Sequence, residues 1–216
     1  MKKIFLFLML FVIYTSAIYS QSNNPYNSTG MNIKNAIVTL TNDYKKGILS
    51  DYNQATISRY KSQFGIDVNI PENLVSSIYT TVTNANFNYV TSINNSSVSQ
   101  YVKTKTLEII NITKTGTPES QRNNIESVVE DIKASNNVDG DKEILLTTCA
   151  AIYNVSISTD EAISTGMNRN EEGAVWGTII GMAIGGVIGA PFCGAPCSFI
   201  GSIVVGFIGN LVGGAS

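Results

Sequence analysis

Residues 173–190 read GAVWGTIIGMAIGGVIGA and carry no charged side chain. Residues four apart lie on the same face of an α-helix. A helix over this stretch would therefore present a strip without side chains, against which a second helix could pack closely. The glycines that form this strip recur at every fourth position: Gly173, Gly177, Gly181, Gly185 and Gly189.

A second apolar stretch, residues 198–212, follows a turn that contains Pro191, Gly194 and Pro196. Proline disfavours the helix interior, so the first helix should end at this turn. The second stretch is also rich in closely spaced glycines, namely Gly201, Gly206, Gly209 and Gly213. The sequence therefore predicts a glycine-zipper helical hairpin over residues 169–216, uncharged from Gly173 onward.

Two environments suit such a hairpin, a lipid bilayer and a dry protein core. In water, each glycine inside a helix costs about 0.8–1.0 kcal/mol relative to alanine. In hydrocarbon the helix becomes nearly obligatory, because the backbone must satisfy its own polar groups. Residues 174–190 would span about 25 Å at about 1.5 Å per residue, somewhat less than the hydrocarbon core of about 30 Å. We expect a short transmembrane helix with Trp176 at the membrane interface.

Two of the three cysteines, Cys193 and Cys197, lie in the turn between the arms. In an oxidising compartment a disulfide between them would close this short loop. Their spacing also suits one face of a helix, although Pro196 argues against a regular helix there. Cys149 lies on an apolar helical face, which indicates a buried and unreactive thiol.

The N-terminus resembles an export signal in its layout. Lys2 and Lys3 precede the apolar run IFLFLMLFVIY at residues 4–14, which is too short to cross a bilayer. We expect a signal peptide over residues 1–20, cleaved after Ser20 or after Ala17, and the alternative is an uncleaved anchor. The protein is then exported, either to the membrane of the cell envelope or into the medium.

The 14 basic and 16 acidic residues all precede Gly173, so the middle of the chain should face water. Residues 21–30 are expected to be a flexible N-terminus, and residues 31–168 a helical extracytoplasmic domain. The fold class expected is mainly α: a helical soluble domain followed by the hairpin. One amphipathic helix should end at Gly47, because apolar residues precede it at helical spacing: Ile33, Ile37, Leu40 and Tyr44.

Other helix signals are local. Thr117 followed by Pro118 is a helix start, and Ser158 with Glu161 forms a capping-box pair that predicts the start of a last short helix. Residues 98–112 are ambiguous, because their isoleucines and threonines suit a strand as well as a helix.

Composition argues against most catalytic and metal-dependent functions. The chain has no histidine, which removes the commonest general base and the commonest metal ligand. Three cysteines cannot form a four-cysteine zinc site. The formal net charge of −2 gives no basic surface for nucleic acid. We therefore expect a protein that is not an enzyme, needs no cofactor and does not bind nucleic acid.

The two segments GAVWGTIIGMAIGGVIGA and GSIVVGFIGNLVGG resemble the glycine-zipper segments of class II-type bacteriocins and other membrane-active peptides. The resemblance covers the last fifth of the chain. Those bacteriocins are usually short and cationic, whereas this chain is long and acidic. The N-terminus, with Asn24, Pro25, Tyr26 and Asn27, resembles exported bacterial proteins.

The resemblance implies a protein that associates with or inserts into a membrane through the hairpin, with a pore-forming or bacteriocin-like activity as the stronger version. Its partners would be lipid and further copies of itself through the zipper. The alternative is a non-catalytic structural or interaction protein with an unidentified protein partner. In that case the hairpin would be an anchor, an oligomerisation element or a buried core.

Overall fold

The computed structural model describes most of the helical domain and isolated positions of the tail. The described residues are 22–48, 77–78, 80–82, 84 and 86–164, followed by 177–178, 181, 185–186, 189–190, 194, 198, 201–202, 205–206 and 209. The predicted signal peptide lies outside them.

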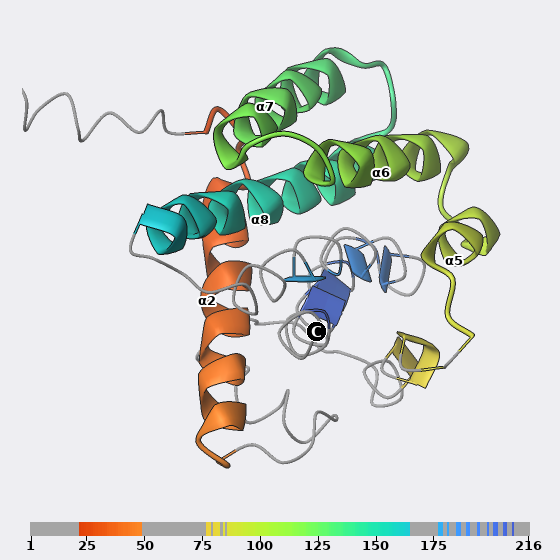
Figure 1. Cartoon of the computed structure of the whole chain (residues 1–216). Helices are drawn as coiled ribbons and strands as arrows, with labels where there is room; N and C mark the ends of the chain where they lie inside the picture. Colours follow the sequence, from red (N-terminus) through yellow and green to blue (C-terminus); the bar gives the residue numbers. More distant parts are fainter. Residues whose placement is uncertain are drawn as a thin grey trace, which may run out of the picture.

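The prediction of a mainly α fold is confirmed, since the part of the chain described here is helical and contains no strand. Figure 1 shows α6, α7 and α8 lying together, while α2 crosses α8 near its own N-terminus and α5 leads into α6. The helices are α2 (Asn27–Lys45), α5 (Tyr89–Asn95), α6 (Gln100–Thr113), α7 (Pro118–Ala134) and α8 (Asp139–Ser164).

The ambiguous stretch, residues 98–112, forms most of helix α6. The Ser99 side chain accepts a hydrogen bond from the backbone N–H of Val102 and caps the helix N-terminus. The buried residues of α6 recur at spacings of three and four, so one face of the helix enters the core. They are Val102, Thr106, Ile109, Ile110 and Thr113.

The predicted start of α7 is confirmed. Thr117 caps the helix by accepting from the N–H of Ser120, and Pro118 occupies the first turn, where its missing N–H costs nothing. In contrast, the capping-box pair Ser158 and Glu161 starts no helix, because α8 runs through both positions to Ser164. That prediction is wrong.

Helix α2 begins earlier than the sequence indicated and ends where it indicated. Its first turn, from Asn27, falls within residues 21–30, the segment predicted to be flexible. Before it, the buried Asn24 donates from Nδ2 to the carbonyl of Leu146 on α8 at 2.6 Å. Two residues after the helix, Gly47 has φ +70°, a conformation that favours glycine.

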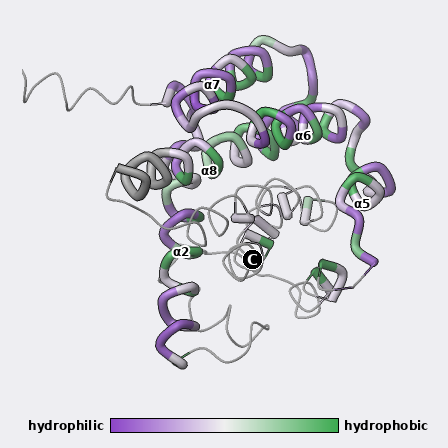
Figure 2. The backbone as a smooth tube through the Cα atoms, in the orientation of Figure 1, coloured by the Kyte–Doolittle hydropathy of each residue, from purple (hydrophilic) through white to green (hydrophobic). Residues whose placement is uncertain are grey.

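Helix α8 lies at the centre of the fold. Every residue from 144 to 156 is buried, over more than three turns, so other parts of the chain must cover this helix on all sides. Helices α2, α6 and α7 all contact α8. Figure 2 shows the result in hydropathy: hydrophilic residues follow the outer faces of α2 and α7, and hydrophobic ones turn toward α8.

The prediction of a transmembrane helix is wrong for the described residues, among which no helix is long and apolar enough to cross a membrane. The two longest helices show the physical reason. Helix α2 carries Lys34, Asp43 and Lys45, and α8 begins with Asp139 and Asp141, charges that are costly to place in hydrocarbon.

Candidate functional site: the glycine-rich tail against α8

The structure describes seven of the nine predicted zipper glycines, and all seven are helical: Gly177, Gly181, Gly185, Gly189, Gly201, Gly206 and Gly209. Five other predicted site residues lie outside the described residues: Gly173, Trp176, Gly213, Cys193 and Cys197. The predicted Cys193–Cys197 disulfide, the interfacial Trp176 and the continuous hairpin over residues 169–216 therefore stay predictions.

The described tail residues bring two backbones into direct contact. A Cβ added to Gly177 would collide with the carbonyl of Gly209, and one added to Gly185 would collide with the carbonyl of Gly201. The collision is reciprocal in both pairs, because a Cβ on Gly201 or Gly209 would meet the partner glycine's carbonyl. At these four positions a side chain larger than hydrogen would collide with a backbone carbonyl.

The two segments are antiparallel. Gly177 contacts Gly209, Gly181 contacts Val205, and Gly185 contacts Gly201. As the first segment advances by four residues, its partner in the second segment therefore moves back by four. Between the segments Gly194 has φ +71°, and its N–H donates to the carbonyl of Ala190 at 2.8 Å.

The tail is also packed into the domain. Thr178, Ala190, Ser198, Ser202 and Val205 are all buried, and Ala190 and Val205 belong to the same hydrophobic cluster as the residues of α2, α6, α7 and α8. A Cβ on Gly186 would lie 2.8 Å from Oγ1 of Thr148 on α8 and 3.2 Å from the Oγ atoms of Ser198 and Ser202.

Tail and α2 occupy opposite sides of α8. Gly30 and Asn27 of α2 contact Ala150 and Asn154 of α8, which are four residues apart and share a face. Thr148 is two residues from Ala150, or about 200° around the helix. The described tail residues therefore cover a side of α8 that α2 does not reach, and together with α2, α6 and α7 they account for the burial of this helix.

This small-residue packing leaves one polar atom without a partner. Ser198 Oγ is buried and forms no hydrogen bond, whereas Thr148 Oγ1 donates to the carbonyl of Ile144 within its own helix at 2.9 Å. An unpaired buried hydroxyl costs about 1–3 kcal/mol. The contact between the tail and α8 is therefore close but less stabilising than a purely apolar one.

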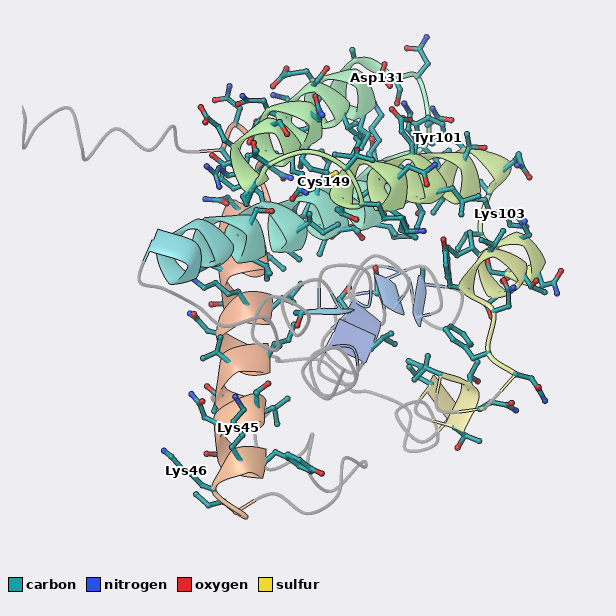
Figure 3. All side chains as sticks on the ribbon, in the orientation of Figure 1. Lys45, Lys46, Tyr101, Lys103, Asp131 and Cys149 are labelled. Carbon is teal, nitrogen blue, oxygen red and sulfur yellow. The ribbon has the colours of Figure 1, made fainter. Side chains whose placement is uncertain are left out.

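Cys149 is the one cysteine within the described residues, and its thiol is free. It is fully buried on α8, as predicted, and Figure 3 shows it where α6 and α8 overlap. Burial raises the pKa of the Cys149 thiol far above its ordinary value, with Glu126 and Glu108 adding to the effect. The thiol is therefore protonated at neutral pH and a poor nucleophile.

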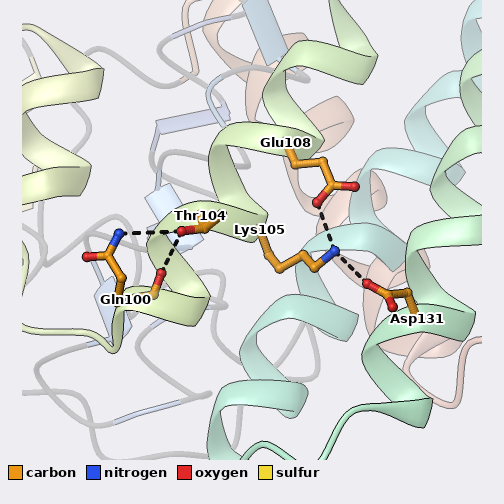
Figure 4. A network of polar contacts seen from close by, with 5 residues as sticks. All are labelled: Gln100, Thr104, Lys105, Glu108 and Asp131. Atoms are coloured by element: carbon orange, nitrogen blue, oxygen red, sulfur yellow. Dashed lines mark hydrogen bonds and ion pairs between the residues drawn. The ribbon is translucent and has the colours of Figure 1, made fainter.

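A cluster of three charged side chains joins α6 to α7 at the surface. Lys105 Nζ lies 2.8 Å from Oε2 of Glu108 and 2.5 Å from Oδ2 of Asp131, as Figure 4 shows. Hydrogen bonds to Asp131 and then to Glu108 raise the pKa of Lys105. A lysine held charged in this way is a structural cation and not a general base. Within the described ranges no group of three acidic or cysteine side chains could hold a metal ion.

The sequence analysis missed two features that organise this site. Gly30, in the segment predicted to be flexible, is the point where α2 meets α8. Thr148 and Ser202, which the sequence analysis did not single out, lie where the tail meets α8 and make this contact polar. The available signal was the run of small residues TTCAA at 147–151, which marks a helix that others approach closely.

Comparison with known proteins found nothing similar: no family model, no curated protein and no solved structure matches the chain.

Proposed function

We propose that this is an exported, non-catalytic binding protein whose glycine-rich tail completes its own helical core. Export rests on the signal-like residues 1–20, and the lack of catalysis rests on the absence of histidine and on the buried Cys149. The tail would make α8 a rigid central helix around which the binding surfaces are arranged.

The main support for this proposal is that the described tail residues are buried against α8. Thr148 faces Gly186, Ser198 and Ser202, on the side of α8 that α2 leaves uncovered. Ala190 and Val205 are each 5% exposed within the same core cluster. Removing the tail would return this face of α8 to water.

Truncation after Glu172 tests the proposal, with hydrogen exchange of the α8 amides 144–156 as the readout. We expect these amides to lose protection in the truncated protein, because the helix loses its cover. Unchanged protection would show that the tail is independent of the core and would overturn the proposal.

Point variants give a second test with the chain intact. Gly185→Val places a side chain against the carbonyl of Gly201 and should destabilise the protein by about 1–3 kcal/mol, as overpacking does. Gly140→Ala is the matched control, since nothing lies within 4 Å of a Cβ at this position in the first turn of α8.

A second candidate function is reversible association with a lipid surface after release of the tail, the bacteriocin-like activity in its mildest form. The unpaired Ser198 hydroxyl favours it, because it weakens the contact that holds the tail against α8. The absence of charge from Gly173 onward lowers the free-energy cost of placing the tail in the apolar part of a lipid layer.

Vesicle experiments separate the two functions. Full-length protein and the truncation ending at Glu172 should be compared for cosedimentation with vesicles and for dye release. Tail-dependent binding or leakage supports the lipid function. Equal behaviour of both proteins removes it and leaves the core function standing.

A further inference from the structure

A cleft of about 680 Å³ lies away from the tail, between the helical residues 77–78 and 80–82 and the start of α5. Its walls come from these two segments and from the connection between them, which includes Asn84, Asn86 and Phe87. In Figure 1 this region lies beside α5, at the far end of the molecule from α2. The volume falls within the range of ligand pockets, about 300–1,000 Å³.

The lining is neutral and hydrogen-bonding. Every described residue that lines the cleft is serine, threonine, asparagine or phenylalanine. A phosphate or carboxylate ligand would be expected to meet lysine or arginine, and an organic cation to meet acidic groups. Neutral amides and hydroxyls instead match a ligand that is itself neutral and both donates and accepts hydrogen bonds.

Local hydrogen bonds fix the orientation of two of the amides. Asn84 Oδ1 accepts from the N–H of Asn86 at 2.8 Å, and Asn88 Oδ1 accepts from the N–H of Thr91 at 3.0 Å, which caps α5. Since a carboxamide is planar, holding its oxygen also sets the direction of its NH₂ group. The lining of the cleft thus includes two carboxamides whose NH₂ groups are oriented before any ligand arrives, which lowers the entropy cost of binding.

The cleft also contains an oriented acceptor and an aromatic ring. Thr81 Oγ1 donates its proton to the carbonyl of Ser77 at 2.8 Å, so its lone pairs remain as acceptors. Phe87 is partly buried and packs against the hydrophobic core, which holds its ring in place. Donors, acceptors and one fixed aromatic ring match a sugar ring, with its hydroxyl groups at the edge and its C–H groups on the face.

We propose that this cleft binds a neutral carbohydrate, a short oligosaccharide with free hydroxyl groups. The inference goes beyond the proposed function and does not depend on the tail. Asn84 and Asn88 would donate to sugar oxygens, Thr81 would accept from a sugar hydroxyl, and the ring of Phe87 would contact the C–H face.

Titration with oligosaccharides tests the proposal on the full-length protein. The probes are maltotriose, cellotriose, mannotriose and chitotriose, with trigalacturonate as an anionic control, and the readout is the side-chain amide NMR signals of Asn84 and Asn88. We expect at least one neutral probe to shift both signals at millimolar concentration, and trigalacturonate to shift neither. If no neutral probe shifts them, or if the anion binds as well, the proposal fails.

Two conservative variants separate binding from folding. Asn84→Asp and Asn88→Asp keep the oxygen that accepts from the backbone, so the turn and the α5 cap remain, but they remove the Nδ2 donors. We expect each variant to weaken binding tenfold or more while the melting temperature stays unchanged. Asn123→Ala, at an exposed position on α7, is the control that should bind as well as the original protein.

Phe87→Ala provides an independent check on the aromatic contact, with melting measured alongside. Binding that survives all three cleft substitutions unchanged would overturn the proposal. Because the tail truncation is a separate experiment, failure of carbohydrate binding leaves the proposed core function of the tail untouched.

Discussion

Gly30 of α2 lies so close to the main chain of Ala150 on α8 that no larger residue fits at position 30. A Cβ added to Gly30 would collide with the carbonyl group of Ala150 and would lie 2.7 Å from its Cβ. The contact joins the first described helix to the central helix. It is flanked by hydrogen bonds from Asn24 to Leu146 and from Asn154 to Asn27.

The first prediction concerns this contact. Gly30→Ala should destabilise the protein by about 1–3 kcal/mol, because the backbones of α2 and α8 must separate to admit the methyl group. Urea denaturation followed by circular dichroism measures the change. Gly140→Ala, in open space, should leave stability unchanged or raise it by up to about 1 kcal/mol. Equal effects of the two substitutions would contradict the close contact.

The second prediction concerns the turn between α6 and α7. Gln121 is 1% exposed, and its Nε2 donates to the carbonyls of Thr113 and Thr115 at 3.3 Å and of Gly116 at 3.5 Å. Gln121→Leu keeps the volume but leaves the carbonyl of the buried Thr113 without this donor, at a cost of about 1–3 kcal/mol. Gln100→Leu, at an exposed position, should change stability by less than about 0.5 kcal/mol. Thermal melts of both variants decide the matter.

The third prediction concerns pH. Burial raises the pKa of the Cys149 thiol, so above about pH 8.5 the unfolded chain releases this proton while the folded protein keeps it. The unfolded state then binds fewer protons, and the free energy of unfolding should fall by up to about 1.4 kcal/mol per pH unit. Urea titrations between pH 7.5 and 9.5 measure the slope.

Cys149→Ala is the control for this slope, with Cys193 and Cys197 replaced by serine in both proteins. The variant should be less stable at neutral pH because it leaves a cavity, yet its stability should decline less with pH. The same slope in both proteins would show that another group is responsible.

The fourth prediction concerns the ion pairs of Lys105. Its side chain is 16% exposed, but those of Glu108 and Asp131 are 43% and 62% exposed, so solvent screens the interaction. Lys105→Met should cost about 1 kcal/mol or less, and 1 M salt should reduce that cost. Because these bonds raise the pKa of Lys105, their contribution persists below about pH 10.4 and is lost as pH rises through the folded-state value.

Lys133→Met is the matched comparison for the fourth prediction. Lys133 pairs with Glu130 within α7 at 2.9 Å, and both side chains are more than a third exposed. Its removal should cost less than that of Lys105, which joins two helices. Thermal melts of the two variants in low and high salt measure both costs. A cost for Lys133→Met that equals or exceeds that for Lys105→Met would show that the link between α6 and α7 is unimportant.

Helices marked by strong local signals could be predicted from the sequence. The apolar spacing of Ile33, Ile37 and Leu40 and the Thr117–Pro118 start both correspond to observed helices. The capping-box pair Ser158 and Glu161 gave a wrong prediction, because α8 continues past both residues. A capping signal describes only the local preference of the chain. Residues 98–112 could not be decided locally, since their isoleucines are held in a helix by burial against other helices.

The site was predictable in part. The fourfold glycine spacing predicts close helix packing, and the glycines that the structure describes include two such approaches, Gly177 to Gly209 and Gly185 to Gly201. It could not distinguish lipid from protein as the environment, because both admit close helix packing. The proposed carbohydrate cleft left no signal, since Asn84 and Asn88 look in sequence like any solvent-facing asparagines, although the residues that line the cleft all lie between Ser77 and Ser92.

The hydrogen bond from Asn24 to Leu146 joins residues 122 positions apart, and the described tail packs on α8 from still farther along the chain. The core therefore cannot close until almost the whole polypeptide is available, and contacts of such long range form late in folding. Under the export that we propose, this late closure would keep the growing chain unfolded, which is the state that passage through a narrow channel requires.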